Sequence, residues 1–287
     1  MHNGIIFLND QFTTMNEASI SLFDLGLVRG YGVFDYLRTY NKVPFHLQKH
    51  LSRFLISAKS IGLFLPKTLV EIELLIVEMI NQVKADELSI KLILTGGVSE
   101  DQLTFEGKPT LAIAVYPFTP LVTQEEYSRG FSVVTTLQER IFPHAKTLVY
   151  LPAIIALQET KKRGFDDALY KNAENHLLES TTSNLFAFKG NKLYTPKENI
   201  LNGITREVIL EIAQKHFQVY EEPILYNELS SIDEIFLTSS NKEIVPVVTV
   251  DTYQIGTGQP GEKTKFLAKE FAAYTQFIST NCATSAE

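Results

Sequence analysis

Segments with helical spacing and segments with strand-like composition alternate along nearly the whole chain, and this alternation limits the fold more than any other feature. Short apolar segments rich in β-branched residues at 33–40, 88–95 and 110–116 predict strands. Apolar residues at helical spacing over 47–62 and 69–83 predict two amphipathic helices. We therefore predict a fold of the α/β class, with strands and helices mixed as in α+β proteins.

The pattern starts again after residues 117–130, which contain two prolines, several acidic residues and a glycine and are typical of a linker. Further predicted strands lie at 131–136, 168–171, 185–188 and 234–238, and further predicted helices at 151–163 and 206–217. The sequence thus predicts two domains: a smaller N-terminal α/β domain over residues 1–118, a linker over 119–128 and a larger domain over 129–287.

Charge and cysteine content exclude several classes of protein. Among 287 residues there are 26 basic and 33 acidic ones, and this acidic excess argues against nucleic-acid binding. The single cysteine, Cys282, excludes an intrachain disulfide and fits a reducing compartment. The N-terminus does not have the pattern of a signal peptide, and apolar runs such as 111–116 are far too short to span a membrane. We therefore predict a cytoplasmic protein with no membrane partner.

Two motifs suggest ligand sites that we do not predict. His46 and His50 have the spacing of two metal ligands on one helix face, but no glutamate follows His46 and no third ligand is suggested. Surface or capping roles are favoured, and we predict no metal site. The sequence 256–264 partly matches a phosphate-binding loop, but the spacing before Lys263 is wrong for that motif. A turn followed by a helix is the expected structure there.

Four other segments carry residues that suit catalysis, although each signal is weak alone. Lys146 lies between a proline-containing turn and an apolar helix, where partial burial would lower its pKa and make the amine a nucleophile. Glu179 precedes a run of short hydroxyl side chains, which also fits a simple turn cap. Residues 202–206 precede a helix and offer backbone N–H groups to an anion, and 238–241 form a third polar turn.

Taken together and in this order, these motifs resemble the class IV aminotransferases, the group of branched-chain and D-amino acid transaminases and aminodeoxychorismate lyase. Residues 21–38 are similar to the family's glycine-rich strand leading into its VFE sequence, and His50-Leu-Ser-Arg53 matches its HLxR sequence. The Lys146 segment, 179–184, 203–206 and 238–246 follow in the C-terminal half. The resemblance covers nearly the whole chain. It implies a fold-type IV architecture and a homodimer, with an interdomain active site completed by loops of the partner.

The resemblance also implies pyridoxal 5'-phosphate as the cofactor, bound by the larger domain. Lys146 would be the Schiff-base lysine and would carry the proton between the substrate Cα and the cofactor, while Glu179 would hold the pyridine nitrogen protonated. The remaining implied cofactor-binding residues surround the phosphate and the ring: Arg53, Ile204 and Thr205 through their N–H groups, Ser240, and at the edge Ser239, Thr181 and Tyr150.

The sequence departs from the family where the substrate is held. Arg29 stands where many members have a tyrosine, Asp35 replaces the usual glutamate, and the loop 95–100 lacks the arginine and histidine of well-known D-amino acid enzymes. Lys91 stands on the strand where branched-chain enzymes often have an arginine.

The substrate carboxylate needs a cation, and the candidates are Arg29 and Lys91, with Arg38 in reserve. Arg29 fits an interface ion pair equally well, and an ammonium such as that of Lys91 cannot make a two-pronged contact. Phe34, in the same motif as Asp35, is a further implied substrate contact.

The implied reaction is a ping-pong transfer of an amino group from an amino acid of branched-chain or D-amino acid type to a 2-oxo acid. Two alternatives remain open at this stage. An aminodeoxychorismate lyase would use the same Lys146 to release pyruvate and 4-aminobenzoate. A catalytically inactive member would act as a binding module, although the presence of Lys146, Glu179 and Arg53 together speaks against it.

Overall fold

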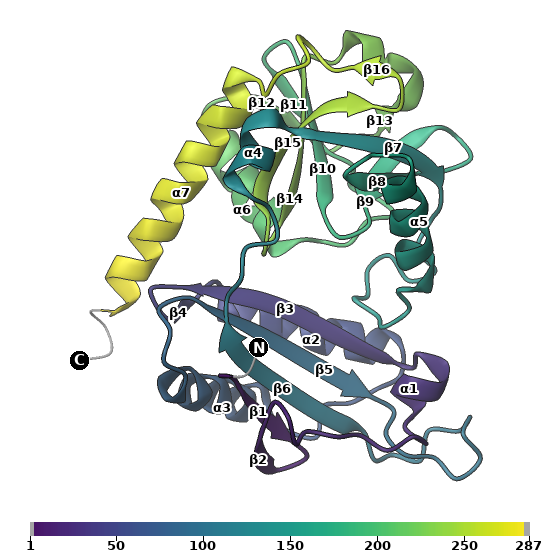
Figure 1. Cartoon of the computed structure of the whole chain (residues 1–287), viewed down its shortest axis with the longest axis vertical. Helices are drawn as coiled ribbons and strands as arrows, with labels where there is room; N and C mark the ends of the chain where they lie inside the picture. The colour runs from purple at the N-terminus through teal and green to yellow at the C-terminus, as the bar shows by residue number, and fades with distance from the viewer. Residues whose placement is uncertain (1–2, 284–287) are drawn as a thin grey trace. The chain divides into compact units, whose positions relative to one another are not determined.

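The computed structural model describes residues 3–283, and the chain divides into two compact units, each with its own sheet and core (Figure 1). The first unit contains residues up to Thr119, the segment Ala145–Val149 and residues from Thr275 onward. The second unit contains Pro120–His144 and Tyr150–Tyr274. The segment that carries Lys146 therefore groups with the first unit, because its backbone is hydrogen-bonded to a strand of that unit.

The first unit is built on a six-stranded antiparallel sheet in the order β2-β1-β6-β5-β3-β4. Its strands are β1 (Ile5–Leu8), β2 (Gln11–Thr14), β3 (Gly32–Tyr40), β4 (Val43–Pro44), β5 (Leu88–Thr95) and β6 (Thr110–Pro117). Its helices are α1 (Leu25–Arg29), α2 (Leu47–Ser60) and α3 (Leu69–Gln82).

Side chains of β3 alternate between the two faces of this sheet, as the period of a strand requires. Val33, Asp35 and Leu37 are buried on the face that packs against the apolar residues of α2 and α3, which form one core cluster with the sheet. Phe34 and Tyr36 point to the opposite face and are only partly buried. This second face of the sheet is called the open face below.

The second unit is built on a ten-stranded sheet in the order β12-β11-β10-β14-β15-β7-β8-β9-β13, with β16 added to β15. A further pairing of Glu179 in β9 with Asn184 in β10 closes part of this sheet into a ring. The strands are β7 (Phe131–Leu137), β8 (Asp167–Lys171), β9 (His176–Ser180), β10 (Asn184–Lys189), β11 (Lys192–Tyr194), β12 (Gln218–Tyr220), β13 (Ile224–Leu225), β14 (Glu234–Ser239), β15 (Glu243–Val250) and β16 (Tyr253–Gln254).

The helices of this second unit are α4 (Gln124–Arg129), α5 (Leu151–Lys162), α6 (Ile204–Ala213) and the 3-10 helix η1 (Tyr226–Ser231). Helix α7 (Glu262–Ala283) begins in this unit, and its residues from Thr275 onward belong to the first unit. In Figure 1, α5 lies beside β8 and α6 lies beside β14, in agreement with the contacts between these elements. The mixed α/β class predicted from the sequence is thus confirmed. No helix in residues 3–283 is both long and apolar enough to cross a membrane.

Two local expectations were wrong, and one short helix was not predicted. Within the predicted linker, helix α4 forms because Thr123 and Glu126 make a reciprocal capping box that starts a helix. Helix α6 begins at Ile204 and ends at Ala213, earlier than predicted at both ends, and the chain then turns so that Phe217 packs edge-on against Phe188. Glu179 lies within strand β9 rather than at the start of a turn.

Candidate active site

Lys146 is fixed at the edge of β3 by its backbone. The Phe34 N–H donates to the Lys146 carbonyl at 2.9 Å, and the Lys146 N–H donates to the Ser57 hydroxyl of α2 at 3.1 Å. The Lys146 Nζ lies 4.7 Å from the centre of the Phe34 ring. The side chain is therefore a half-buried amine against an aromatic ring, a setting that differs from that of an ordinary solvated lysine.

A buried charge cluster lies next to this amine, under the packed face of β3. Asp35 is fully buried and accepts from Arg53 Nε at 2.8 Å and from Arg53 Nη2 at 2.7 Å. His50, one helical turn before Arg53 on α2, places Nδ1 2.7 Å from Asp35 Oδ1. The two-pronged contact fixes the plane of the Arg53 guanidinium.

The protonation states in this cluster follow from burial and charge. Burial alone would raise the pKa of Asp35, but the Arg53 charge and the hydrogen bonds from Arg53 and His50 outweigh it and hold the pKa of that carboxyl well below its usual range. Burial lowers the pKa of His50, against the opposing effect of Asp35. His50 is thus neutral near pH 7 and donates from Nδ1 to Asp35. Its Nε2 is buried and has no hydrogen-bond partner among the described residues.

The open face of the first sheet carries the predicted substrate contacts. Lys91 pairs with Tyr36 across β5 and β3, and its Nζ lies 5.9 Å from the centre of the Phe34 ring. The Tyr36 hydroxyl lies 2.9 Å from the Ser89 hydroxyl. Phe34 is therefore a common neighbour of the Lys91 and Lys146 ammonium groups.

The two arginine candidates are placed differently. Arg38 is engaged: it donates to Glu87 at 3.2 Å, and its guanidinium lies 3.7 Å from the centre of the Phe118 ring. Arg29 is exposed at the end of α1, where it donates to the carbonyl of Val28 at 2.9 Å.

In the second unit, Glu179 is almost fully buried and is paired with an arginine that sequence reasoning missed. Arg140 Nε donates to Glu179 Oε1 at 2.6 Å, and Arg140 Nη2 donates to the Thr181 carbonyl at 3.0 Å. The Leu201 N–H lies 3.3 Å from both carboxylate oxygens. The Tyr150 ring, at the start of α5, lies 5.7 Å from the Arg140 guanidinium.

The start of α6 has the properties of an anion site. Gly203 caps the helix without a side-chain hydrogen bond, and a Cβ added at this glycine would lie 2.1 Å from the Asn184 side-chain oxygen. The first N–H groups of a helix have no partner within it. The Thr205 hydroxyl is buried without a hydrogen-bond partner among the described residues, and the same holds for the hydroxyls of Ser183 and Thr238.

The other hydroxyl candidates have partners in the chain. The Thr181 hydroxyl donates to the buried Asp167 at 2.7 Å. The Ser239 hydroxyl, at the end of β14, donates to the Asn241 side-chain oxygen at 3.0 Å. Ser240 follows Ser239 in the turn between β14 and β15 and is partly buried. Of the hydroxyls without a partner among the described residues, that of Thr205 lies in the first turn of α6.

Comparison with known proteins decides the family. The model of the family "amino-transferase class IV" matches residues 32–250, which include all the helices and strands described above except β1, β2, α1, β16 and α7. The chain belongs to this family. It is 34% identical, over 93% of its length and 94% of the relative's, to a putative branched-chain-amino-acid aminotransferase of Methanocaldococcus jannaschii. It is 32% identical to a D-alanine aminotransferase of Staphylococcus aureus, over 94% of this chain and 98% of the relative.

Solved structures agree with this class IV assignment. A branched-chain aminotransferase of Thermoproteus uzoniensis with norvaline superimposes with a TM-score of 0.85 and 28% identity, covering 94% of each chain. A branched-chain amino acid aminotransferase of T.th., solved with pyridoxamine 5'-phosphate, gives a TM-score of 0.88 at 25% identity, covering 95% of this chain and 94% of that one. The protein is thus a class IV aminotransferase, and members of this family depend on pyridoxal phosphate.

The two motifs rejected from the sequence have other roles in this aminotransferase. His46 begins helix α2 with a left-handed backbone and makes no capping bond with its side chain, whereas His50 belongs to the Asp35 cluster. In the loop 256–264, the Glu234 carboxylate accepts from the N–H groups of Lys263 and Thr264 and from the Thr264 hydroxyl. An acidic side chain of the protein itself therefore takes the donors that a phosphate would need.

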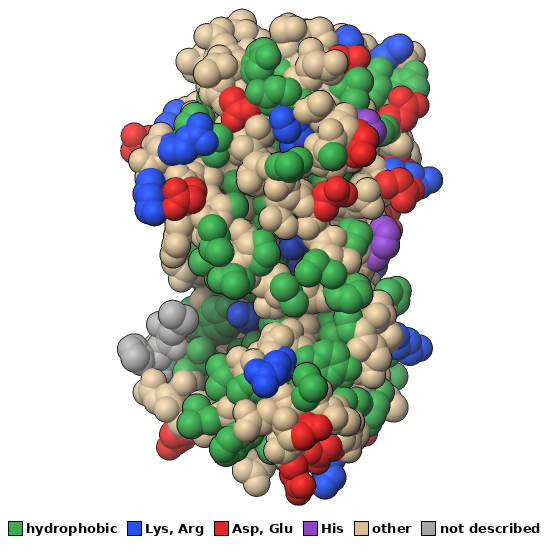
Figure 2. Space-filling model, turned by 90° about the vertical axis from the view of Figure 1, so that its right-hand side faces the viewer, with side chains coloured by type: hydrophobic (Ala, Val, Ile, Leu, Met, Phe, Trp, Pro, Cys, Tyr) green, Lys and Arg blue, Asp and Glu red, His purple; other side chains and the backbone are tan. Residues whose placement is uncertain are grey.

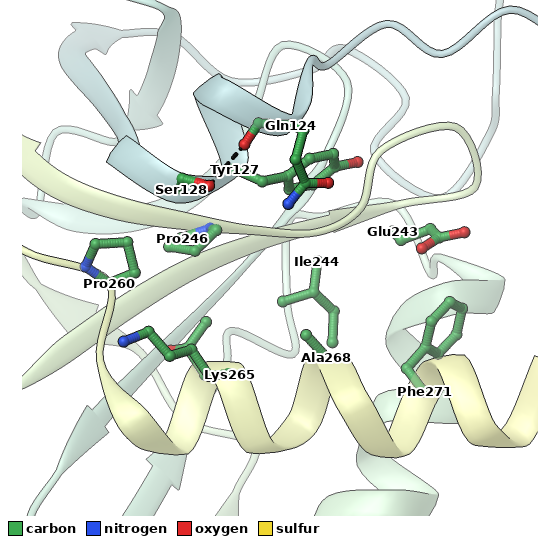
Figure 3. Close-up of a pocket in the computed structure, with 11 residues that line it drawn as sticks. Gln124, Tyr127, Ser128, Glu243, Ile244, Pro246, Pro260, Lys265, Ala268 and Phe271 are labelled. Atoms are coloured by element: carbon green, nitrogen blue, oxygen red, sulfur yellow. Dashed lines mark hydrogen bonds between the residues drawn. The ribbon is translucent and has the colours of Figure 1, made fainter.

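The second unit also contains a pocket of about 390 Å³ between α4, β15 and α7 (Figure 3). Tyr127 of α4 and Lys265, Ala268 and Phe271 of α7 line it from opposite sides, with Ile244 between them. None of the residues predicted for catalysis or cofactor binding lines this pocket.

Proposed function

We propose that this aminotransferase works with pyridoxal 5'-phosphate, that Lys146 is its catalytic amine, and that it acts on α-amino acids and 2-oxo acids. The observation that carries the proposal is the position of Lys146, half-buried against Phe34 and beside the Asp35 cluster. The comparisons name transaminases, so the lyase and the inactive binding module are not pursued.

The residues of the second unit fit the cofactor's phosphate. A buried hydroxyl without a partner is costly, by about 1–3 kcal/mol, unless a ligand satisfies it. Thr205 is such a residue at a helix start, and Ser183 and Thr238 are two more. An anion at the start of α6 would receive these hydroxyls together with the N–H groups of Ile204 and Thr205. Arg53, Ser240 and, less directly, Ser239 complete the proposed phosphate-binding set.

The cofactor supplies an aldehyde that bonds to an amine and a ring that withdraws electrons from the substrate Cα. The residues of this chain bind it and move the proton. Lys146 would provide the amine and would take the proton from the substrate Cα. Glu179 would accept a hydrogen bond from the pyridine N–H and so keep the ring protonated. The Asp35 cluster fixes Arg53, and Tyr150 packs at the edge of the site.

Lys91 is the cation that we propose for the substrate carboxylate. It lies on the open face beside Phe34, the ring that also contacts Lys146. Arg38 is engaged with Glu87 and Phe118, and Arg29 with its own backbone neighbour. Both the branched-chain and the D-amino acid classes remain within this proposal, because an ammonium fixes the carboxylate without choosing between mirror-image substrates.

An absorption spectrum of the purified protein tests the proposed function. A cofactor band at roughly 400–430 nm, as the cofactor's own chemistry dictates, is expected to bleach when the correct amino acid is added. A panel of L- and D-amino acids then names the donor and its handedness. A band that no amino acid in the panel bleaches, with no amino transfer to any 2-oxo acid, would sink the proposal.

Two variants test the carboxylate contact. Lys91→Met should raise the KM for the amino acid by about 10-fold, the loss of one charged contact, with a smaller change in kcat. Arg29→Ala is the matched variant at the other candidate cation. If Arg29→Ala raises KM and Lys91→Met does not, the role moves to Arg29.

We further propose that the protein is a homodimer. Each unit exposes large apolar side chains in clusters, which are typical of interfaces when they lie together. In the first unit they lie at Ile20, Leu22, Phe23 and Leu27, and in the second at Ile141, Phe142, Leu151, Ile154 and Ile155. Figure 2 shows hydrophobic side chains gathered on the face that carries α5. Light scattering coupled to size exclusion checks the mass, and a monomer at micromolar concentration would contradict the proposal.

A further inference from the structure

Glu179 is a buried carboxylate held against an arginine. Its side chain belongs to a residue that is 2% exposed, so the ionised form needs a partner to offset the cost of burial. Arg140 provides a cation through the 2.6 Å contact from Nε to Oε1, and the Leu201 N–H adds a neutral donor. Arg140 thus offsets the charge of Glu179, although Arg140 has no role of its own in the proposed reaction.

Arg140 is itself held from several sides. It lies just after the end of β7, outside any helix or strand, so only its contacts fix the side chain. Its Nη2 donates to the Thr181 carbonyl, in the turn that follows Glu179. Its guanidinium lies 5.7 Å from the ring centres of both Tyr150 and Tyr170. The arginine therefore joins the carboxylate, the turn after it and two aromatic rings.

The charges around this pair are consistent with a permanent ion pair. Burial disfavours the charged guanidinium, but the Glu179 carboxylate outweighs burial, and the pKa of Arg140 stands above its ordinary value. Burial raises the pKa of Tyr170 to about 12, so this phenol is neutral at working pH. The Tyr150 phenol is the third group that faces the guanidinium. Glu179 is thus the anion with which Arg140 forms its ion pair.

We propose that Arg140 is a positioning residue of this aminotransferase: it keeps Glu179 ionised and fixes the direction in which the carboxylate points. The inference rests on the proposed role of Glu179 at the pyridine nitrogen. A carboxylate that must receive a hydrogen bond from a ring N–H has to stay anionic, and a rotating or protonated one cannot do so. The proposed role of Arg140 acts through Glu179, which distinguishes it from a catalytic residue.

The test compares Arg140→Met, Arg140→Lys and Glu179→Gln in the full-length protein, with Arg129→Met as the matched control. Arg129 makes a two-pronged ion pair with Asp166 in the same unit, but it is half-exposed and is not one of the predicted site residues. The measurements are the dissociation constant of pyridoxal phosphate from the apo-protein by equilibrium dialysis, and the pH dependence of kcat. Circular dichroism checks the fold of every variant.

Arg140→Met should weaken cofactor binding by about 10-fold or more, as expected for a lost charge-assisted hydrogen bond. Without the cation, the pKa of Glu179 rises, so the acidic limb of the kcat profile should move to higher pH by about one unit or more. Arg140→Lys should move it less, because the charge is kept and the planar contact is lost. Arg129→Met should leave both measurements unchanged.

The double variant Arg140→Met/Glu179→Gln separates positioning from simple structural support. If Arg140 acts through Glu179, the double variant binds the cofactor as Glu179→Gln alone does. It also removes both buried charges, so it is expected to fold even if Arg140→Met alone does not. A further loss in the double variant, beyond that of Glu179→Gln, would overturn the inference.

Two other outcomes also decide the matter. If Glu179→Gln impairs cofactor binding while Arg140→Met keeps the wild-type affinity and pH profile, Arg140 has no positioning role and the proposed function stands. If Glu179→Gln leaves both measurements unchanged, the proposed role of Glu179 is wrong and the inference fails with it.

Discussion

Two groups of buried polar side chains, one in each unit, differ in how their hydrogen bonds are made. In the first unit, the Asp35 carboxylate is surrounded by Arg53 and His50, and its hydrogen bonds are made within the chain. In the second unit, three buried hydroxyls at Thr205, Ser183 and Thr238 have no partner among the described residues. The carboxylate is satisfied by the protein itself. We expect the proposed cofactor to satisfy the hydroxyls.

We therefore expect substitutions in the first group to change the stability of the protein, and substitutions in the second group to change cofactor binding. Residues of the Asp35 cluster should contribute to the free energy of unfolding with or without a cofactor, because their partners belong to the protein. The hydroxyls of the second unit should contribute only when the cofactor is bound, and by mass action the bound cofactor should stabilise the fold. The predictions below follow this contrast from the largest effect to the smallest.

Substitution of Lys146 should give the largest difference between the effect on activity and the effect on stability. Lys146→Ala should lower the rate of amino transfer by about 1,000-fold or more, since both the amine and the proton carrier are lost. The fold should be preserved, because the segment is held through backbone hydrogen bonds to β3 and α2. Lys189→Ala, at a half-exposed lysine, is the control. Near wild-type turnover in Lys146→Ala, measured with any active donor, would show the assignment to be wrong.

Asp35→Asn should cost about 3–5 kcal/mol of unfolding free energy at pH 7, because it leaves the buried Arg53 charge without its partner. The pKa of Asp35 is lowered by folding, so its contribution is present above the unfolded pKa of about 4 and is lost as the pH falls below it. The difference between wild type and variant, measured by urea unfolding, should therefore shrink below pH 4. Asp86→Asn, at an exposed carboxylate of the first unit, should show a much smaller loss.

Thr205→Val tests the ligand-dependent cluster. The dissociation constant of pyridoxal phosphate should rise by about 10-fold, while the apo-protein should keep or gain stability because a buried unsatisfied hydroxyl is removed. Thr195 gives the matched control: it is equally buried, but its hydroxyl donates to the Leu185 carbonyl at 2.8 Å. Thr195→Val should lose stability and keep cofactor affinity. If Thr195→Val weakened cofactor binding and Thr205→Val did not, the proposed contact between Thr205 and the cofactor would be wrong.

His50 gives the smallest effect. Its pKa is lowered in the folded protein, so the unfolded chain binds a proton that the native state does not. Stability should therefore fall as the pH drops through the unfolded pKa of about 6.5, by at most about 1.4 kcal/mol per pH unit. His50→Gln should give a shallower slope between pH 7 and pH 5 in thermal unfolding. Equal slopes would indicate that His50 is charged in the native protein.

The sequence predicted those elements whose local pattern agrees with their tertiary environment. Strand β5 was placed at its observed ends, and α2 and α3 to within two residues, because their apolar residues repeat with the period of the face that they bury. Strand β15 was missed because Pro246 interrupts it, and a proline argues against a central strand. The pairing of Pro246 with Phe236 on β14 is visible only in the tertiary structure.

For the candidate active site, too, the sequence predicted only residues that belong to a local pattern. Lys146, Glu179 and Thr205 were found because they belong to short motifs in a fixed order. Arg140 was missed because it lies in a segment without periodicity, and only the closed sheet brings it to Glu179 across 39 residues. In the structure, the burial of Glu179 in β9 requires a cation, and Arg140 lies just after the end of β7, the strand that pairs with β8. Neither the burial nor the strand pairing can be read from the sequence.

The pairing of β15 with β7 also bears on how the chain folds during synthesis. Val247 pairs with Phe131 in a parallel arrangement, so more than roughly a hundred residues must be made before this contact forms. The ring that contains Glu179 and Asn184 includes both strands. A ribosome-bound chain that ends before β15 therefore contains every strand of the first sheet. The ring of the second sheet is still open at that stage, because β15 is the strand between β14 and β7.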